Sequence, residues 1–160
     1  MTVAMVLATG DVPGSGLSTG SVRIEGVVEH GDARGRTIGF PTANISVPDM
    51  DIRDGVWAGT VHVESDQGVR AYAAAVSIGR RPTYYRKGLR LLEAHLLGFT
   101  GDLYGRRVVV TLQVRVRPQR RFGSTEELVR QIEQDVALVS QWSAVERGCS
   151  GHEEGLRNGQ

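Results

Sequence analysis

The 160-residue sequence predicts a mainly β fold, an antiparallel barrel or sandwich with one helix near its C-terminal end. Short segments between residues 22 and 117 alternate apolar and polar side chains, which is typical of half-buried strands. One later segment, which begins at Ser124, changes to apolar spacings of three and four, which are typical of a helix. At this length we expect one domain with its own core.

Alternation and turn residues locate the elements in chain order. They predict strands at residues 22–29, 56–64, 69–78, 89–97 and 107–117, the last being the clearest. A glycine-rich loop follows the first strand at residues 31–44, and residues 45–53 are predicted to be irregular. Residues 65–68 have the composition of a hairpin loop, and further loops are expected at residues 79–88 and 98–105.

The helix is predicted from its cap and its periodicity. Ser124 followed by Glu127 matches a capping box. The apolar residues that follow at helical spacing are Leu128, Ile132, Val136 and Val139. We therefore predict a helix from Ser124 to about Trp142 that packs on the sheet and closes the core. Residues 21–142 would form the domain, residues 1–20 a flexible arm, and residues 143–160 a disordered tail.

Composition and missing motifs exclude several classes of function. A formal net charge of +1 gives no general attraction to nucleic acid or to acidic membranes, and no apolar run approaches the roughly 18 residues that cross a bilayer. Lys87 is the only lysine and precedes a glycine, so there is no Walker-type phosphate loop, and the serine-hydrolase motif G-x-S-x-G is also absent. Scattered histidines and one cysteine, Cys149, predict neither a zinc site nor a disulfide, and we expect a cytoplasmic protein.

Residues 31–44 are the first candidate binding site. Glycines at 31, 35 and 39 allow close backbone approach, and successive N–H groups in such a loop can bind a phosphate. Pro41 stiffens the exit from the loop, so Thr42 and Asn44 should lie on one side of an extended chain. Neutral oxygens beside a phosphate loop suit Mg²⁺. Residue types alone also allow a surface loop with an arginine-rich rim.

Glu93 is the second candidate. In the predicted strand it shares a face with His95, between Leu91 and Leu97. A carboxylate on a partly apolar face suits a general base. The same spacing also fits a solvated strand face, in which case His95 is a packing or hydrogen-bonding residue.

Six ordered blocks together resemble one family. They are H-G-D-A-R-G-R-T-I-G-F-P-T-A-N at 30–44, D-G-V-W-A at 54–58, S-I-G-R-R-P-T at 77–83, L-E-A-H-L-L at 92–97, G-D-L-Y-G at 101–105 and R-P-Q-R-R-F-G-S at 117–124. Over residues 20–140 the sequence is similar to the riboflavin kinase (flavokinase) family, including the kinase module of bacterial bifunctional FAD-synthesising enzymes.

The resemblance implies a six-stranded antiparallel Greek-key barrel with a C-terminal helix. It implies transfer of the ATP γ-phosphate to the ribityl 5′-hydroxyl of riboflavin, which gives FMN and ADP, with Mg²⁺ or another divalent cation. Riboflavin, FMN, ATP and ADP would be the partners of a monomer that binds neither nucleic acid nor membrane.

The resemblance also assigns roles to residues. Glu93 would be the catalytic carboxylate, Thr42 and Asn44 the ligands of Mg²⁺–ATP, and Arg117 and Phe122 would lie at the flavin. The implied ATP and phosphate-binding residues are Gly31, Arg34, Gly35, Arg36, Gly39, Pro41 and Thr42. If so, Thr42 and Asn44 should face Glu93 across one cleft.

Two departures leave alternatives open. The family commonly has Asp at the positions of Gly98 and Gly123, so the chain could instead be a flavin- or nucleotide-binding module with reduced catalysis. A small barrel that binds single-stranded nucleic acid is a third hypothesis, which the near-neutral charge and few aromatic residues disfavour. About twenty residues before the domain cannot house an adenylyltransferase module, so FAD synthesis by this chain alone is not expected.

Overall fold

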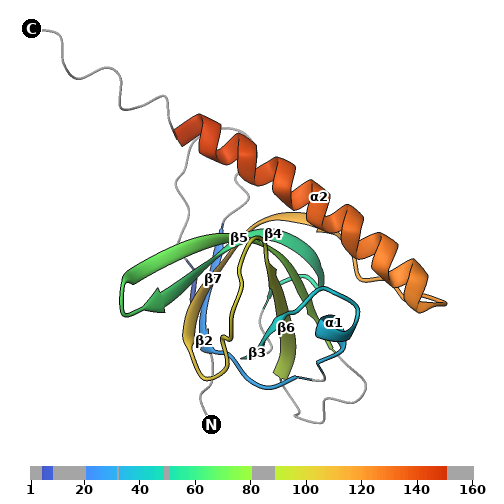
Figure 1. Cartoon of the computed structure of the whole chain (residues 1–160), viewed down its shortest axis with the longest axis horizontal. Helices are drawn as coiled ribbons and strands as arrows, with labels where there is room; N and C mark the ends of the chain where they lie inside the picture. Colours follow the sequence, from blue (N-terminus) through green and yellow to red (C-terminus); the bar gives the residue numbers. More distant parts are fainter. Residues whose placement is uncertain (1–4, 9–20, 32, 49–50, 81–88, 151–160) are drawn as a thin grey trace, which may run out of the picture.

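The structure is a computed structural model that describes residues 5–8, 21–31, 33–48, 51–80 and 89–150, and it shows a barrel flanked by a long helix (Figure 1). Its elements are β1 (Met5–Ala8), β2 (Val22–Val27), α1 (Arg34–Thr37), β3 (Ala43–Pro48), β4 (Gly55–Ser65), β5 (Gly68–Gly79), β6 (Leu89–Leu96), β7 (Arg107–Arg117) and α2 (Thr125–Ser150). No helix in these described ranges is long and apolar enough to cross a membrane.

All strands join one antiparallel sheet in the order β1-β2-β7-β4-β5-β6-β3. The six strands from β2 to β3 curl into a nearly closed barrel, because Glu29, just after β2, forms an isolated bridge with Asn44 of β3. Its N–H donates to the Asn44 carbonyl oxygen at 2.8 Å. β7 returns to lie beside β4, so β7-β4-β5-β6 has Greek-key order. The predicted six-stranded Greek-key barrel is confirmed.

Strand alternation fills the barrel interior. One face of each strand carries β-branched and leucine side chains, which suit a pleated and half-buried surface. Fully buried examples are Ile24, Val61, Val76, Ile78, Val108, Val110 and Leu112. Asp66 and Gln67 form the two-residue turn of the predicted β4–β5 hairpin.

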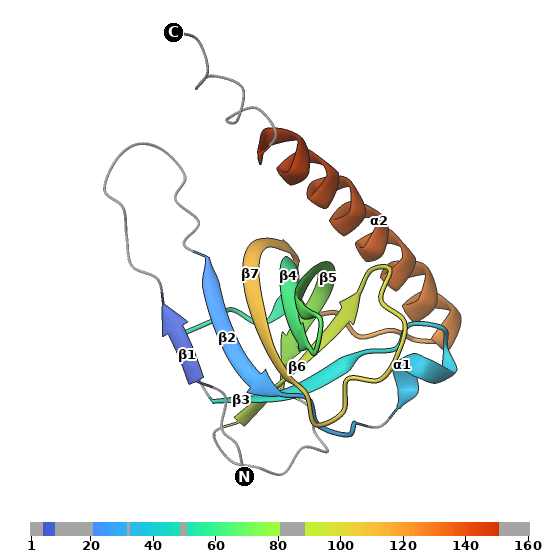
Figure 2. The same cartoon turned by 60° about the vertical axis from the view of Figure 1, so that its left-hand side comes forward.

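Helix α2 lies along the outside of the barrel next to β4 and β5 (Figures 1 and 2). Its first turn is capped as predicted, because Ser124 Oγ accepts from the Glu127 N–H at 3.2 Å and Glu127 Oε2 accepts from the Gly123 N–H at 3.0 Å. Val139 is fully buried, yet the interior cluster contains no α2 residue within the described chain. The helix therefore packs on the outside of the barrel and buries Val139 there, while the interior cluster itself is formed by strand and loop residues.

Two strand boundaries differ from the predictions. Met5–Ala8 pairs with β2, so these residues belong to the sheet and not to a flexible arm. Residues 45–48, expected to begin an irregular segment, belong to strand β3, in which Ala43, Ile45 and Val47 alternate with polar residues. Pro48 weakened that signal, but proline is tolerated at the end of an edge strand.

The helical content was also underestimated. One turn of helix, α1, interrupts the glycine-rich loop, where Gly35 argues against a helix. Helix α2 continues to Ser150, eight residues beyond the predicted end at Trp142, because a single Gly148 costs a helix only about 1 kcal/mol and no proline follows. The rest of the predicted arm, the loop at 84–88 and the tail at 151–160 lie outside the described residues.

Candidate active site

A cavity of about 920 Å³ lies between the α1 loop, strands β4 to β6, and the first half of α2. Both views place α1 beside the start of α2 (Figures 1 and 2). The predicted site residues that line the cavity are Arg34, Gly35, Thr42, Glu93, Arg117 and Phe122. The predicted residues outside its lining are Gly31, Arg36, Gly39, Pro41 and Asn44. The volume falls within the range of about 300–1,000 Å³ that is usual for small-molecule sites.

The loop that bounds the cavity has a demanding backbone. Ala33 has a left-handed conformation at φ 53°, and Gly39 has φ 89°. Gly35 is required by close approach, since a Cβ there would lie 2.3 Å from the Phe40 carbonyl oxygen. The Phe40 N–H donates to the Gly35 carbonyl oxygen at 2.7 Å, which closes the loop on itself. The local fold therefore depends on glycine at 35.

Asn44 connects this loop to the strand that carries the carboxylate. Its side chain is 6% exposed and lies under Gly31, where an added Cβ would be 2.3 Å from the amide nitrogen. Asn44 is also the cross-strand partner of Glu93 in the β3–β6 ladder. Directly opposed residues of an antiparallel pair have side chains on the same face. Asn44 therefore lies between Gly31 of the loop and Glu93, which lines the cavity.

The neighbours of Glu93 complete this face of β6. Leu91, Glu93 and His95 all line the cavity, as their alternation predicts. The His95 Nδ1 atom is 2.8 Å from the Pro41 carbonyl oxygen, and its ring meets Phe40 edge-on at a centroid distance of 5.4 Å. His95 therefore holds the loop exit against β6 as a hydrogen-bonding residue.

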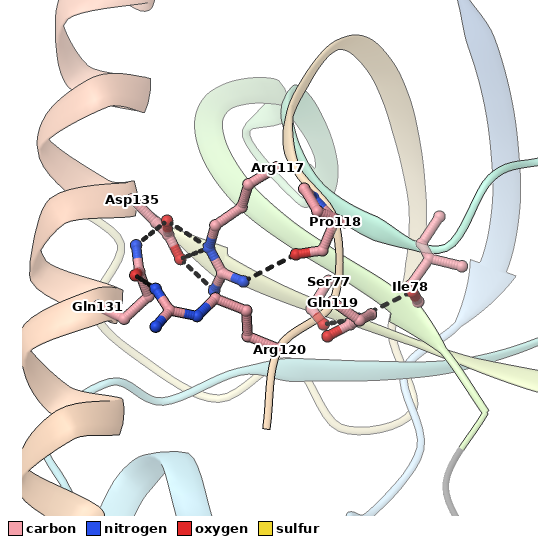
Figure 3. Close-up of polar contacts among 8 residues, drawn as sticks. All are labelled: Ser77, Ile78, Arg117, Pro118, Gln119, Arg120, Gln131 and Asp135. Atoms are coloured by element: carbon pink, nitrogen blue, oxygen red, sulfur yellow. Dashed lines mark hydrogen bonds and ion pairs between the residues drawn. The ribbon is translucent and has the colours of Figure 1, made fainter. Parts of the chain in front are cut away.

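The opposite wall is the last residue of β7 and the chain that follows it, residues 117–123, which we call the β7–α2 segment. Figure 3 shows that its polar side chains point in two directions. Arg117 forms an ion pair with Asp135 of α2 at 2.7 Å, and Arg120 donates to Gln131 at 3.1 Å. Gln119 reaches the other way and donates to Ser77 Oγ at 2.9 Å on β5. The segment is thereby tied to both the helix and the barrel.

Charged groups of both signs line the cavity. The basic ones are Arg34, Arg80, Arg117, Arg120 and Arg121, and the acidic ones are Asp54, Glu93 and Asp135. Asp54 is paired with the buried Arg90 at 2.6 Å, and Asp135 with Arg117. The guanidinium groups of the arginines match phosphate oxygens, so this lining suits a phosphate-bearing ligand. The carboxylates suit a ligand group that donates a proton.

Sequence reasoning missed Ser77, Gln119 and Asp135. Asp135 did have a signal, because it lies three residues after Ile132 and four before Val139, on the apolar face of the helix. A buried acid on such a face needs a partner. Ser77 and Gln119 are 42 residues apart in sequence, and no local pattern pairs them.

The donor atoms near the loop fit a hard divalent cation. The described residues include no group of three His, Cys, Asp or Glu side chains that could hold a metal ion by themselves. Thr42, Asn44 and Glu93 offer only oxygen-bearing groups that suit Mg²⁺, which commonly takes few protein ligands and is completed by substrate phosphates and water. The residues present therefore fit Mg²⁺ that is completed by phosphate oxygens of a ligand.

A small antiparallel barrel with an arginine-lined cavity between a glycine loop and a helix defines a binding domain for small phosphate-containing molecules. The family model described as "Flavokinase: Riboflavin kinase" matches residues 19–143. The chain therefore belongs to the riboflavin kinase (flavokinase) family.

Similar proteins agree with this assignment. The "Bifunctional riboflavin kinase/FMN adenylyltransferase" of Bacillus subtilis (strain 168) is 38% identical over 116 residues, which are 70% of this chain and 35% of that protein. The protein of the same description from Escherichia coli (strain K12) is 43% identical over 114 residues, which are 70% of this chain and 35% of that protein. The chain thus spans about a third of the length of these curated relatives.

A solved structure shares the fold as well. The riboflavin kinase from Trypanosoma brucei superposes with a TM-score of 0.56 at 26% identity, covering 76% of each chain. The barrel with its flanking helix is therefore a fold that this family uses.

Proposed function

We propose that this chain transfers the γ-phosphoryl group of ATP to the ribityl 5′-hydroxyl of riboflavin, giving FMN and ADP. Its membership in the riboflavin kinase family supports the reaction class. The observation that carries the proposal is that Thr42, at the exit of the glycine loop, and Glu93, on β6, line the same cavity. This shared lining supports a phosphate site beside a carboxylate that would direct a hydroxyl toward it.

In this proposal the nucleotide phosphates bind at the loop of residues 31–42. Backbone N–H groups and the Arg34 guanidinium would contact phosphate oxygens, and Thr42 and Asn44 would hold the cation beside them. A bound divalent cation would supply positive charge next to the phosphates as negative charge redistributes during transfer. Gly31, Arg36, Gly39 and Pro41, which do not line the cavity, would shape the loop from behind.

Glu93 would act as the general base. Its carboxylate accepts the proton of the ribityl 5′-hydroxyl as the new bond forms between that oxygen and the γ-phosphorus. The bond from the γ-phosphorus to the β–γ bridging oxygen breaks, and ADP leaves with that oxygen. Leu91, two residues before Glu93, adds an apolar side chain to the same cavity wall. Phosphoryl transfer depends mainly on positioning and charge stabilisation, which this arrangement supplies.

The acceptor would bind on the other side of Glu93. Phe122, Leu128 and Ile132 give this wall apolar and aromatic surface, which suits a planar ring system such as the flavin. Arg117 and Phe122 remain the predicted flavin residues. We expect a cytoplasmic monomer that needs no nucleic acid or membrane partner.

The test is to incubate the purified chain with riboflavin, ATP and Mg²⁺ and to follow FMN by chromatography. FMN that depends on both ATP and a divalent cation is the expected result. If no FMN forms with any of several divalent cations, the proposal is wrong.

A second candidate is a flavin- or nucleotide-binding module with reduced catalysis. Gly123, where the family commonly has Asp, lines the cavity, whereas Gly98 is exposed at φ 74° on a loop outside it. Only the first departure therefore alters the cavity wall. Tight riboflavin binding without turnover would favour this candidate over the kinase.

A further inference from the structure

We propose that Asp135 is a positioning residue for the flavin, and that its ion pair with Arg117 fixes the β7–α2 segment as the acceptor wall of the cavity. The inference rests on the proposed function and adds a requirement for binding one of the two substrates. Asp135 would act through Arg117 and would not itself touch the reacting atoms.

Arg117 and Asp135 form a bidentate ion pair. Arg117 Nε donates to Asp135 Oδ1 at 2.8 Å, and Arg117 Nη2 donates to Asp135 Oδ2 at 2.7 Å. A further hydrogen bond reaches Asp135 Oδ1 from Gln131 Nε2 at 3.1 Å. Asp135 is only 3% exposed, so its carboxylate has little contact with water. Two parallel hydrogen bonds fix both the distance and the plane of the guanidinium group.

The fixed guanidinium orients the chain that follows it. Arg117 Nη1 also donates to the carbonyl oxygen of Pro118 at 3.1 Å, so the same group holds the next residue of the segment. The Phe122 ring lies 5.9 Å from the Arg117 guanidinium carbon and 5.7 Å from that of Arg120. Both distances are within the range of cation–π attraction, about 6 Å. The position of Phe122 in the cavity wall therefore depends on arginines that are themselves tied to α2.

The segment is also tied to the strand next to the carboxylate. Gln119 Nε2 donates to Ser77 Oγ and to the Ile78 carbonyl oxygen, each at 2.9 Å (Figure 3). Ser77 is the cross-strand partner of Glu93 in the β5–β6 ladder. The acceptor wall and the proposed base thus share a continuous set of contacts, and loss of the Arg117–Asp135 pair would release one end of it.

The pair is better explained by positioning than by stability. A buried ion pair is often no more stabilising than apolar side chains of similar size, although removing one partner is costly. An apolar pair could hold α2 against the barrel but could not set the plane of a guanidinium group. Both partners line the cavity, so the constraint acts where the flavin would bind. The hydrogen bonds of Arg117 and Asp135 in the described part of the chain join them to each other, to Pro118 and to Gln131, and not to the loop of residues 31–42, so ATP binding should be spared.

The experiment compares three variants of the full chain. Asp135→Asn retains Arg117 but removes the charge, and the double variant Arg117→Met/Asp135→Leu replaces the pair with apolar groups. Arg107→Met/Glu25→Leu removes a pair of 2.6 Å on the barrel whose residues lie outside the cavity lining, and it serves as the control. For each variant, kcat and the KM values for riboflavin and ATP are measured, together with the free energy of unfolding in urea.

We expect Asp135→Asn to raise the KM for riboflavin roughly tenfold or more, with the KM for ATP within about twofold of wild type. The Arg117→Met/Asp135→Leu variant should recover stability while the KM for riboflavin stays raised, and the control should change neither KM. An unchanged KM for riboflavin in Asp135→Asn overturns the inference. So does a double variant in which stability and the KM recover together, because the pair would then be merely structural.

Riboflavin binding, followed by quenching of flavin fluorescence, separates this inference from the proposed function. If the wild-type chain makes no FMN, the proposed function fails, and the inference is then judged on the dissociation constants alone. Weaker riboflavin binding to both Asp135 variants than to wild type and control supports it, and equal binding overturns it.

Discussion

Asn44 and Glu93 are opposed across the β3–β6 ladder, which places an amide and a carboxylate side by side on one face of the barrel. The register of β3 against β6 makes these two side chains neighbours. A slip of one residue would turn Asn44 to the other face and separate it from Glu93. Thr42, two residues before Asn44, lines the same cavity as Glu93. The proposed phosphate site and the proposed base therefore depend on one strand pairing.

Replacing Glu93 by glutamine should remove the base while keeping the shape of the side chain. We expect kcat to fall by about 100-fold or more, because general-base catalysis typically contributes that much. Riboflavin binding, measured by fluorescence quenching, should change little. Glu64→Gln, at the exposed end of β4 and outside the cavity lining, is the matched control. A kcat for Glu93→Gln within threefold of the control would remove Glu93 from the mechanism.

Thr42→Val removes a hydroxyl but keeps the branched shape of the side chain. If Thr42 holds the cation with the nucleotide, the Mg²⁺ concentration that gives half-maximal activity should rise by roughly tenfold, within the range seen when partners of metal sites are lost. The KM for riboflavin should stay near the wild-type value. Thr42→Ser should restore most of the activity, and Thr100→Val, in an exposed loop, should have no effect. Equal Mg²⁺ titrations for Thr42→Val and wild type would contradict the role.

Gly35→Ala tests whether the loop geometry is needed for the nucleotide. The added Cβ would lie 2.3 Å from the Phe40 carbonyl oxygen, so the loop must rearrange. We expect kcat/KM for ATP to fall about tenfold or more, since small misplacements of binding groups are costly. Gly148→Ala is the control, because nothing lies within 4 Å of a Cβ there and alanine favours a helix. Wild-type kcat/KM for ATP in Gly35→Ala would show that the loop does not position the nucleotide.

Elements that depend on local sequence patterns could be predicted, whereas features that depend on contacts between distant segments could not. Strand β7 was predicted with both boundaries correct, because its alternation is local and uninterrupted. Strand β3 was missed because its alternation is short and ends at Pro48, which weakened the strand signal. One-turn α1 and the Gln119–Ser77 hydrogen bond could not be predicted, since each depends on contacts made by the folded loop or by distant segments. Asp135 was the one missed residue that the helical pattern marked.

The start of α2 should make stability depend on pH in acid. A backbone hydrogen bond, followed by the Ser124 hydroxyl, lowers the pKa of Glu126 below its ordinary value of 4.5. A carboxyl group with a lowered folded-state pKa stabilises the fold above its unfolded pKa, and that contribution is lost as pH falls through the folded pKa. Glu126→Gln should therefore lower the Tm at pH 7, and the difference from wild type should disappear as the pH falls well below 4.5. Glu133→Gln, mid-helix and exposed, is the control, and a Tm difference for Glu126→Gln that persists at low pH would contradict the assignment.

Two adjacent residues of α2 test whether its second half packs on the barrel. Val139 is 0% exposed, whereas Leu138 is 51% exposed. Val139→Ala removes two buried methyl groups, so the free energy of unfolding should fall by about 2 kcal/mol. Leu138→Ala should change it by less than about 0.5 kcal/mol, although it deletes the larger side chain. Urea unfolding of the two variants and wild type measures both values. Because Val139 lies one turn after Asp135, similar losses for the two variants would mean that α2 is not held against the barrel at this point, and the Arg117–Asp135 pair would then have no firm support.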